Sequence, residues 1–114
     1  MKTLVYAFLI LLPVTMSAST VVIVQTNSAG DNIHLIDPAT NKVVKIVKDI
    51  EVPHGAAMAP DGSRMYVTNE SLHTLDFVDM KTLKVTKQVK LSGRPNNLSI
   101  SKDGRRGLCC LCFF

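Results

Sequence analysis

Short apolar and β-branched runs alternate with polar clusters along most of this chain. Runs at 21–26, 32–36 and 42–48 are separated by the polar clusters 27–31 and 37–41. This layout is typical of β-strands joined by tight turns, in which Asn, Asp, Gly and Pro supply the turn geometry. The lysines of 42–48 are three apart, which would also suit a helix, but the four Val and Ile residues between them favour a strand. The pattern therefore predicts an all-β chain.

The same pattern then recurs further along the chain. One constant shift without gaps aligns Thr26-Asn27 with Thr68-Asn69, Asp37 with Asp79, Thr40 with Thr82, Pro53 with Pro95, and Asp61-Gly62 with Asp103-Gly104. A period of about 40 to 45 residues that contains only strand-like segments indicates propeller blades rather than helical solenoids.

The second copy carries the sequence Tyr66-Val67-Thr68-Asn69, followed by Asp79 and Thr82. With these motifs, residues 21–106 resemble the family of bacterial β-propellers that is named after its Tyr-Val-Thr-Asn repeat. The resemblance implies a seven-bladed periplasmic propeller with a site in the central channel or on the loop face. It is informative about the fold and says little about activity.

Propeller blades contain four antiparallel strands, and the strands can be assigned on that basis. The segment 55–90 forms one complete blade, 21–48 supplies three outer strands of an earlier blade, and 97–101 supplies the inner strand of a later one. In complete propellers of this kind a C-terminal strand commonly closes the N-terminal blade. We therefore predict an open, unclosed propeller fragment with exposed apolar faces, marginally stable or prone to aggregation.

The N-terminus has the layout of a secretory signal peptide. Lys2 precedes the apolar run Leu4 to Leu12, Pro13 ends that run, and small residues follow at 17–19. We predict a signal peptide at 1–18 cleaved after Ala18, with a buried first strand or an anchor helix as the alternatives. The prediction implies a periplasmic, secreted or cell-surface protein with no membrane span after cleavage.

The C-terminus departs from the repeat. Cys109, Cys110 and Cys112 stand where an apolar strand is expected, and their spacing fits neither a zinc site nor a disulfide framework. One inserted nucleotide would convert codons for Val-Tyr-Val-Ala into Gly-Leu-Cys-Cys, the residues at 107–110. We interpret 107–114 as an out-of-frame tail, and a genuine cysteine-rich tail is the alternative.

Charge excludes some partners. The formal net charge is +4, and loss of Lys2 with the signal peptide makes it about +3, too mild and scattered for a nucleic-acid surface. The lysines at 42, 45, 48 and at 84, 87, 90 recur once per repeat on one predicted strand. We interpret them as a solvated outer edge that discourages pairing with other sheets.

Three residues are candidate ligand contacts near the channel mouth: His54, Arg94 and Asn96. Pro53-His54-Gly55 is similar to a segment of haem d1-binding propellers of periplasmic nitrite reductases and of quinoprotein-like propellers. Asn96 is the repeat counterpart of His54, so the fold does not require the histidine. The alternative is that His54 is structural or merely solvated.

No catalytic residue, metal ligand or cofactor is predicted, because the recurring aspartates suit turn capping better than acid and base roles. We therefore expect a non-catalytic propeller scaffold that binds an unknown small molecule or protein at its channel face. The alternative is a fragment of a periplasmic enzyme or cofactor-carrying propeller of the haem d1, quinoprotein or lactonase type.

Overall fold

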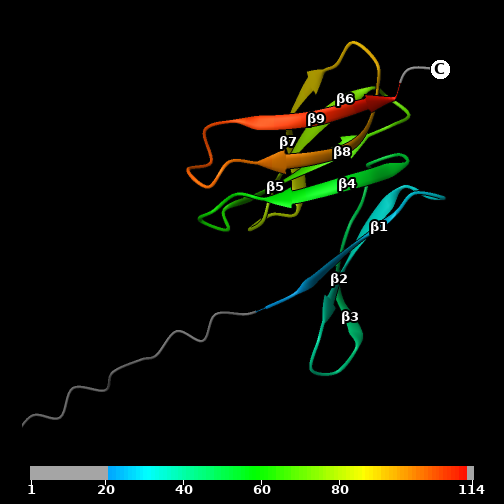
Figure 1. Ribbon diagram of the computed structural model, residues 1–114. Coiled ribbons are helices and arrows are strands. Elements are labelled where there is room, and N and C mark those ends of the chain that lie inside the picture. The colour runs from blue at the N-terminus through cyan, green and yellow to red at the C-terminus, as the bar shows by residue number, and fades with distance from the viewer. Residues whose placement is uncertain (1–20, 113–114) are drawn as a thin grey trace, which may run out of the picture.

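The computed structural model describes residues 21–112, which form nine strands and no helix (Figure 1). The strands are β1 (Ile23–Asn27), β2 (Asn32–Asp37), β3 (Lys42–Val47), β4 (Pro53–Met58), β5 (Arg64–Asn69), β6 (Thr74–Asp79), β7 (Lys84–Lys90), β8 (Arg94–Ile100) and β9 (Gly107–Cys112). They make three antiparallel sheets: sheet 1 is β1-β2-β3, sheet 2 is β4-β5-β6-β7 and sheet 3 is β8-β9. One four-stranded blade lies between two partial ones, so the predicted fold class is confirmed.

Equivalent strands pair in the same register in successive sheets. Ile23 lies opposite Ile36 in sheet 1, and Met65 lies opposite Val78 at the same place in sheet 2. The irregularity between Leu35 and Ile36 also recurs, between Phe77 and Val78. A one-residue slip would turn every side chain of a strand to the other face of the sheet. Because the two sheets share one register, residues at equivalent positions of the repeat face the same side and have equivalent neighbours.

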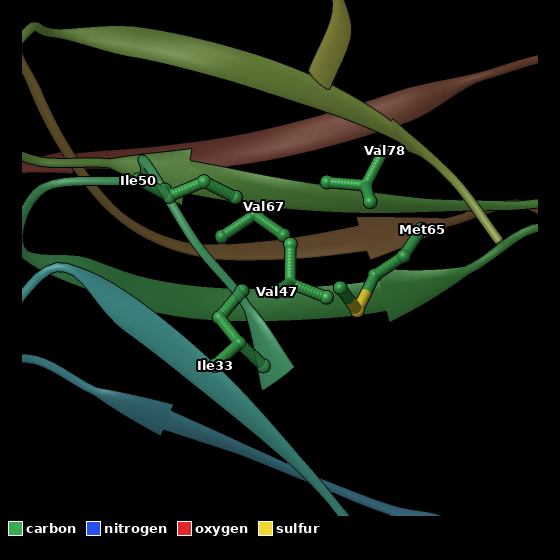
Figure 2. Close-up of a cluster of buried hydrophobic side chains, with 6 residues drawn as sticks. All are labelled: Ile33, Val47, Ile50, Met65, Val67 and Val78. Atoms are coloured by element: carbon green, nitrogen blue, oxygen red, sulfur yellow. The ribbon is translucent and has the colours of Figure 1, made fainter. Parts of the chain in front are cut away.

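The sheets are stacked face to face, and the core lies between sheets 1 and 2. Strand β4 lies between β1 and β8, which belong to the sheets on either side (Figure 1). Six fully buried side chains fill the first contact: Ile33, Val47, Ile50, Met65, Val67 and Val78 (Figure 2). Burial of each such side chain is worth roughly 1.5–3 kcal/mol, more than an exposed ion pair contributes, so apolar packing rather than surface charge holds sheets 1 and 2 together.

Aspartates cap the tight turns, as predicted from the sequence. The Asp79 carboxylate accepts hydrogen bonds from the backbone N–H groups of Lys81 and Thr82 and from the Thr82 hydroxyl. Asp61 accepts from the backbone and hydroxyl of Ser63 in the β4–β5 turn. In that turn Gly62 has φ +69°, which glycine adopts without strain.

The third sheet is longer than the sequence predicted. The sequence predicts only an inner strand at 97–101 there, with the repeat ending before 107, but residues 107–112 form β9 and pair with β8. Gly107 lies opposite Ile100 at the place where Met65 lies opposite Met58 in sheet 2. Backbone hydrogen bonds make the pair, so a tail of extended apolar and cysteine residues can complete it without the repeat's own side chains. Its proposed out-of-frame origin stays a prediction.

The predicted signal peptide, 1–18, lies outside the described residues. No helix in the described part of the chain, 21–112, is long and apolar enough to cross a membrane.

Candidate functional site

The inner strands β4 and β8 approach each other closely at Gly55. A Cβ atom on this residue would lie 2.7 Å from the carbonyl oxygen of Asn96 and 2.9 Å from the Cα of Asn97. Both are backbone atoms that cannot rotate away, so this position needs a residue without a side chain. The close approach brings the first residues of β4 and β8 to the same end of the stack.

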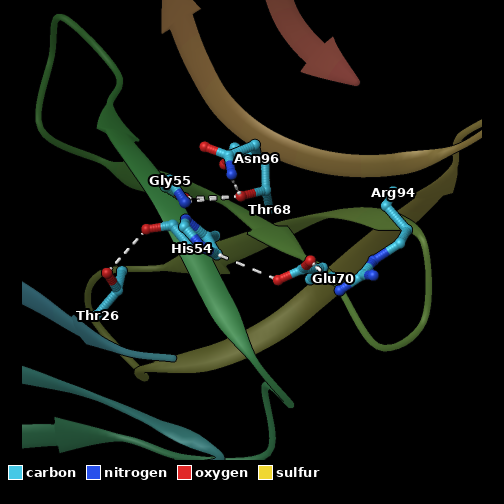
Figure 3. A network of polar contacts seen from close by, with 7 residues as sticks. All are labelled: Thr26, His54, Gly55, Thr68, Glu70, Arg94 and Asn96. Atoms are coloured by element: carbon cyan, nitrogen blue, oxygen red, sulfur yellow. Dashed lines mark hydrogen bonds and ion pairs between the residues drawn. The ribbon is translucent and has the colours of Figure 1, made fainter. Parts of the chain in front are cut away.

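A threonine hydroxyl joins each sheet to the next. Thr26 Oγ1 donates to the carbonyl oxygen of His54 at 2.8 Å, and Thr68 Oγ1 donates to that of Asn96 at 2.7 Å (Figure 3). Thr68 Oγ1 also accepts the Gly55 N–H at 2.7 Å. Thr26 and Thr68, which align in the repeat, therefore each fix the inner strand of the following sheet, and with it the backbone of His54 and of Asn96.

Glu70, the residue after β5, lies at the centre of a charged cluster at this end. Its side chain is only 14% exposed and forms an ion pair with the guanidinium of Arg94. Glu70 Oε2 lies 3.9 Å from His54 Nε2 on its other side (Figure 3). We call Glu70, His54 and Arg94 the Glu70 cluster. It joins sheet 2 to sheet 3, since Arg94 is the first residue of β8.

A recess of about 350 Å³ opens beside the Glu70 cluster. It is lined by Val52, Glu70, Ser71, His73 and Arg94. Two of these residues have left-handed backbone conformations, with φ +47° at Val52 and +53° at His73. A positive φ at a β-branched residue such as Val52 is strained, and such strain is concentrated at functional sites.

The residues of the Glu70 cluster are not required by the repeat. The positions one repeat before and after Glu70 hold Ser28 and Cys112, and the position one repeat before Arg94 holds Val52. The same fold is therefore built with uncharged residues at these places. Charged side chains that depart from the repeat yet converge at one point are candidates for function.

The larger recess of about 730 Å³ has a different character. It lies between the outer strands and is lined by Ile46, Lys48, Asp49, Thr82, Leu83, Lys84, Val85 and Gln88. Lys48 and Lys84 belong to the lysine series that recurs in both sheets, and Thr82 caps the Asp79 turn. These residues already have structural roles at the outer edge and in the turns of each blade. The recess beside the Glu70 cluster is therefore the better candidate site.

The three predicted site residues have different surroundings in the structure. It brings His54 and Arg94 to opposite sides of the Glu70 carboxylate. Asn96 instead contributes its backbone carbonyl to the bond from Thr68. Sequence reasoning missed Glu70, and the signal that could have found it is the appearance of a charge where the first copy has Ser28.

The remaining polar groups of the described residues suit structural roles. The fully buried Asp76 carboxylate accepts hydrogen bonds from Asn69, Thr74 and Gln88, which satisfies it within sheet 2. Burial, with a smaller contribution from Cys110, raises the pKa of the Cys109 thiol, so this cysteine is a poor nucleophile. Residues 21–112 contain no group of three or more His, Cys, Asp or Glu placed to hold a metal ion.

Comparison with known families gives a match over most of the chain. The family described as YNCE-like beta-propeller matches residues 7–109. Among curated proteins, the beta subunit of hydrazine synthase from Kuenenia stuttgartiensis is 36% identical over 53 residues. That match covers 46% of this chain and 14% of the subunit.

Solved structures share the fold. Kuenenia stuttgartiensis hydrazine synthase matches with a TM-score of 0.74 and 27% identity, over 79% of this chain and 26% of that one. Dihydro-heme d1 dehydrogenase NirN in complex with DHE matches with a TM-score of 0.65 and 24% identity, over 86% of this chain and 22% of that one. A functionally unknown protein from Desulfotomaculum acetoxidans gives 0.60 and 15%, over 74% and 29%. The chain therefore spans about a quarter of the length of these solved proteins and 14% of the curated subunit.

Proposed function

Because this chain belongs to the YNCE-like β-propeller family, we propose that it is part of an exported, non-catalytic binding scaffold whose ligand sits against the Glu70 cluster. The single observation that carries the proposal is the convergence of Glu70, Arg94 and His54 at one end of the inner strands. These residues depart from the repeat, and they flank a recess whose lining includes strained backbone.

The chemistry of the recess favours binding over catalysis. The Glu70 carboxylate is engaged by Arg94, so it is poorly placed to take a proton from a substrate. The Arg94 side chain is half exposed, and a guanidinium offers several donors in a fixed plane. The recess can therefore offer a ligand a positioned guanidinium, an imidazole from His73 and the Ser71 hydroxyl.

Export rests on the predicted signal peptide of residues 1–18, and periplasmic or cell-surface placement follows from it. The ligand would be a small molecule or a segment of another protein. We propose no bound nucleic acid, because the net charge is only +4.

The second candidate is part of a periplasmic enzyme or cofactor-carrying propeller. What favours it is the 36% identical match to a hydrazine synthase subunit, together with the fold likeness to dihydro-heme d1 dehydrogenase NirN. A visible absorption band that copurifies with the chain would support this candidate over the scaffold.

A fragment screen followed by protein NMR tests the proposed site. A library of small carboxylates, amines and neutral fragments is added to the isotope-labelled chain, and the backbone amide signals are followed. We expect hits to shift the signals of Glu70, His73 and Arg94, and we expect Glu70→Gln to weaken those hits about tenfold by releasing Arg94.

Asp31→Asn is the matched control. Asp31 is exposed and accepts a hydrogen bond from the Asn32 side chain, and it lies outside both the Glu70 cluster and the lining of the recess. This variant should leave the affinities unchanged. Hits confined to the outer recess around Leu83 and Val85 would contradict the proposal.

A further inference from the structure

The outer recess of about 730 Å³ lies between sheets 1 and 2 and is bounded on both sides by described strands. Ile46 of β3 lines it from sheet 1, and Val85 of β7 lines it from sheet 2. Leu83, in the turn between β6 and β7, is a further apolar residue of its lining. The recess therefore does not depend on what flanks residues 21–112.

Leu83 is the residue of this recess that the edge and the turn do not explain. Its backbone is left-handed, with φ +57°, and its counterpart one repeat earlier, Asn41, has φ +54°. Asparagine adopts this conformation more readily than leucine, so the turn by itself favours asparagine at this position. The leucine side chain instead supplies apolar surface, because it packs against the buried core and lines the recess.

The segments on the two sides of the recess carry charge of one sign. Residues 42–48 and 80–90 contain lysines at 42, 45, 48, 81, 84, 87 and 90, and they contain none of the 9 acidic residues of the chain. All of these lysines are exposed. Asp49, next to Lys48, is the one carboxylate in the lining of the recess. The outer margin of the two sheets is therefore locally cationic, although the net charge of the chain is small.

Strand β7 is the outer strand of sheet 2, and among the described residues it pairs only with β6. Alternate backbone N–H and C=O groups along its other edge can therefore pair with an added strand. Val85 lies opposite Val78, on the side of sheet 2 that packs against sheet 1. Lys87 lies opposite Phe77 and over its ring, on the other side. An added strand would meet apolar surface on one side and lysine on the other.

We propose that the outer edge of β7 binds an extended acidic segment of another protein as an added strand. Apolar side chains of the segment fill the recess against Ile46, Leu83 and Val85. Its carboxylates lie beside Lys84 and Lys87. A strand can meet both surfaces at once, because its successive side chains point to opposite faces. The lysines repel a second edge of their own kind and attract one of opposite charge.

The apolar lining favours a peptide over other anions. A nucleic acid or a lipid head group would engage the lysines and leave Ile46, Leu83 and Val85 in water. The side chains of a peptide strand would cover them, which adds apolar burial to the attraction between charges.

Titration of the isotope-labelled chain with a synthetic peptide tests the proposal. The probe alternates glutamate and valine over 7 residues, the length of β7. We expect it to shift the backbone amide signals of β7 and Leu83 and to slow hydrogen exchange along the outer edge of β7. A control peptide of the same composition, with all glutamates before all valines, should bind about tenfold more weakly because its valines cannot share one face.

Two substitutions separate charge from apolar contact. Lys84→Glu should weaken the alternating peptide about fivefold, because it replaces an attraction at the exposed edge by a repulsion. Leu83→Asn, which introduces the residue of the equivalent turn in sheet 1, should weaken it by a similar factor through lost apolar contact. The matched control is Lys102→Glu in the exposed β8–β9 turn, which changes the net charge equally and should leave the affinity almost unchanged.

The site is independent of the Glu70 cluster, so Glu70→Gln should leave peptide binding unchanged. The proposal is wrong if the alternating peptide leaves the β7 signals in place, or if the control peptide binds equally well. It is also wrong if Lys102→Glu weakens binding as much as Lys84→Glu. Equal shifts of the β7 signals by a single strand of thymidine nucleotides or by phosphatidylglycerol vesicles would overturn it too, because charge alone would then hold the ligand. Far-ultraviolet circular dichroism establishes that each variant keeps its strands.

Discussion

Single residues set how closely the inner strands approach, and Gly55 is the clearest of them. It lies against the backbone of β8, while the hydroxyl of Thr68 bonds both to the Gly55 N–H and to the Asn96 carbonyl. The position equivalent to Thr68 in β9 is Cys110, whose thiol is a much weaker donor. The sheet-to-sheet hydroxyl bond is therefore specific to Thr26 and Thr68 among the described strands.

Gly55→Ala should lower the free energy of unfolding by about 1–3 kcal/mol. The new methyl group would lie within 3.1 Å of three backbone atoms of β8, so the inner strands would have to separate. Urea unfolding followed by circular dichroism measures the change. Gly30→Ala is the matched control, because its Cβ would meet nothing closer than 3.6 Å. Equal effects of the two substitutions would contradict the close approach.

At the scale of elements, turns and strands follow from different kinds of sequence signal. The Asp79 turn is specified by a local motif, so it could be predicted before the structure, and the same holds for the Asp61 and Asp103 turns. Strand β9 contains no such motif. It forms because its backbone pairs with β8, and this pairing cannot be recognised from the pattern of side chains alone. The sequence therefore predicts the turns but not the second strand of sheet 3.

The Asp79 turn gives a prediction about pH. Hydrogen bonds from the Thr82 backbone and hydroxyl, and a weaker one from the Lys81 backbone, hold the pKa of the Asp79 carboxyl below its ordinary value of 3.8. A carboxyl with a depressed folded-state pKa contributes stability above the unfolded-state pKa and loses it as pH falls through the folded-state value. The free energy of unfolding should therefore fall as the pH drops below about 4.

The neutral variant Asp79→Asn should show a shallower loss of stability in that range. Urea unfolding at a series of pH values measures it. Asp31→Asn, which alters an exposed carboxylate that accepts a bond from the adjacent Asn32 side chain, serves as control. A pH profile of Asp79→Asn that is identical to that of the parent chain would argue against the turn as its source.

At the scale of the whole molecule, the sequence predicted the order of the sheets better than it predicted the site. The shared register of sheets 1 and 2 depends on repeated strands and turns, which are visible as identities at equivalent positions of the two repeats. The Glu70 cluster depends on three residues from β4, β8 and the end of β5, which meet only after the sheets stack. His54 and Arg94 could be placed at the right end of the stack, but their common partner could not.

Stacking of consecutive sheets is what assembles the candidate site. It brings β4 against β8 and forms the recess beside Glu70. If the sheets did not pack in this order, the Glu70 cluster would not form.

Methyl NMR of the chain, with Ile, Val and Met methyl groups labelled, tests this stacking most directly. Stacking of sheet 1 on sheet 2 predicts nuclear Overhauser contacts between methyl groups of Ile33 and Val47 in sheet 1 and those of Met65, Val67 and Val78 in sheet 2. Contacts confined within each sheet, or contacts joining sheet 1 to sheet 3 in place of sheet 2, would contradict it.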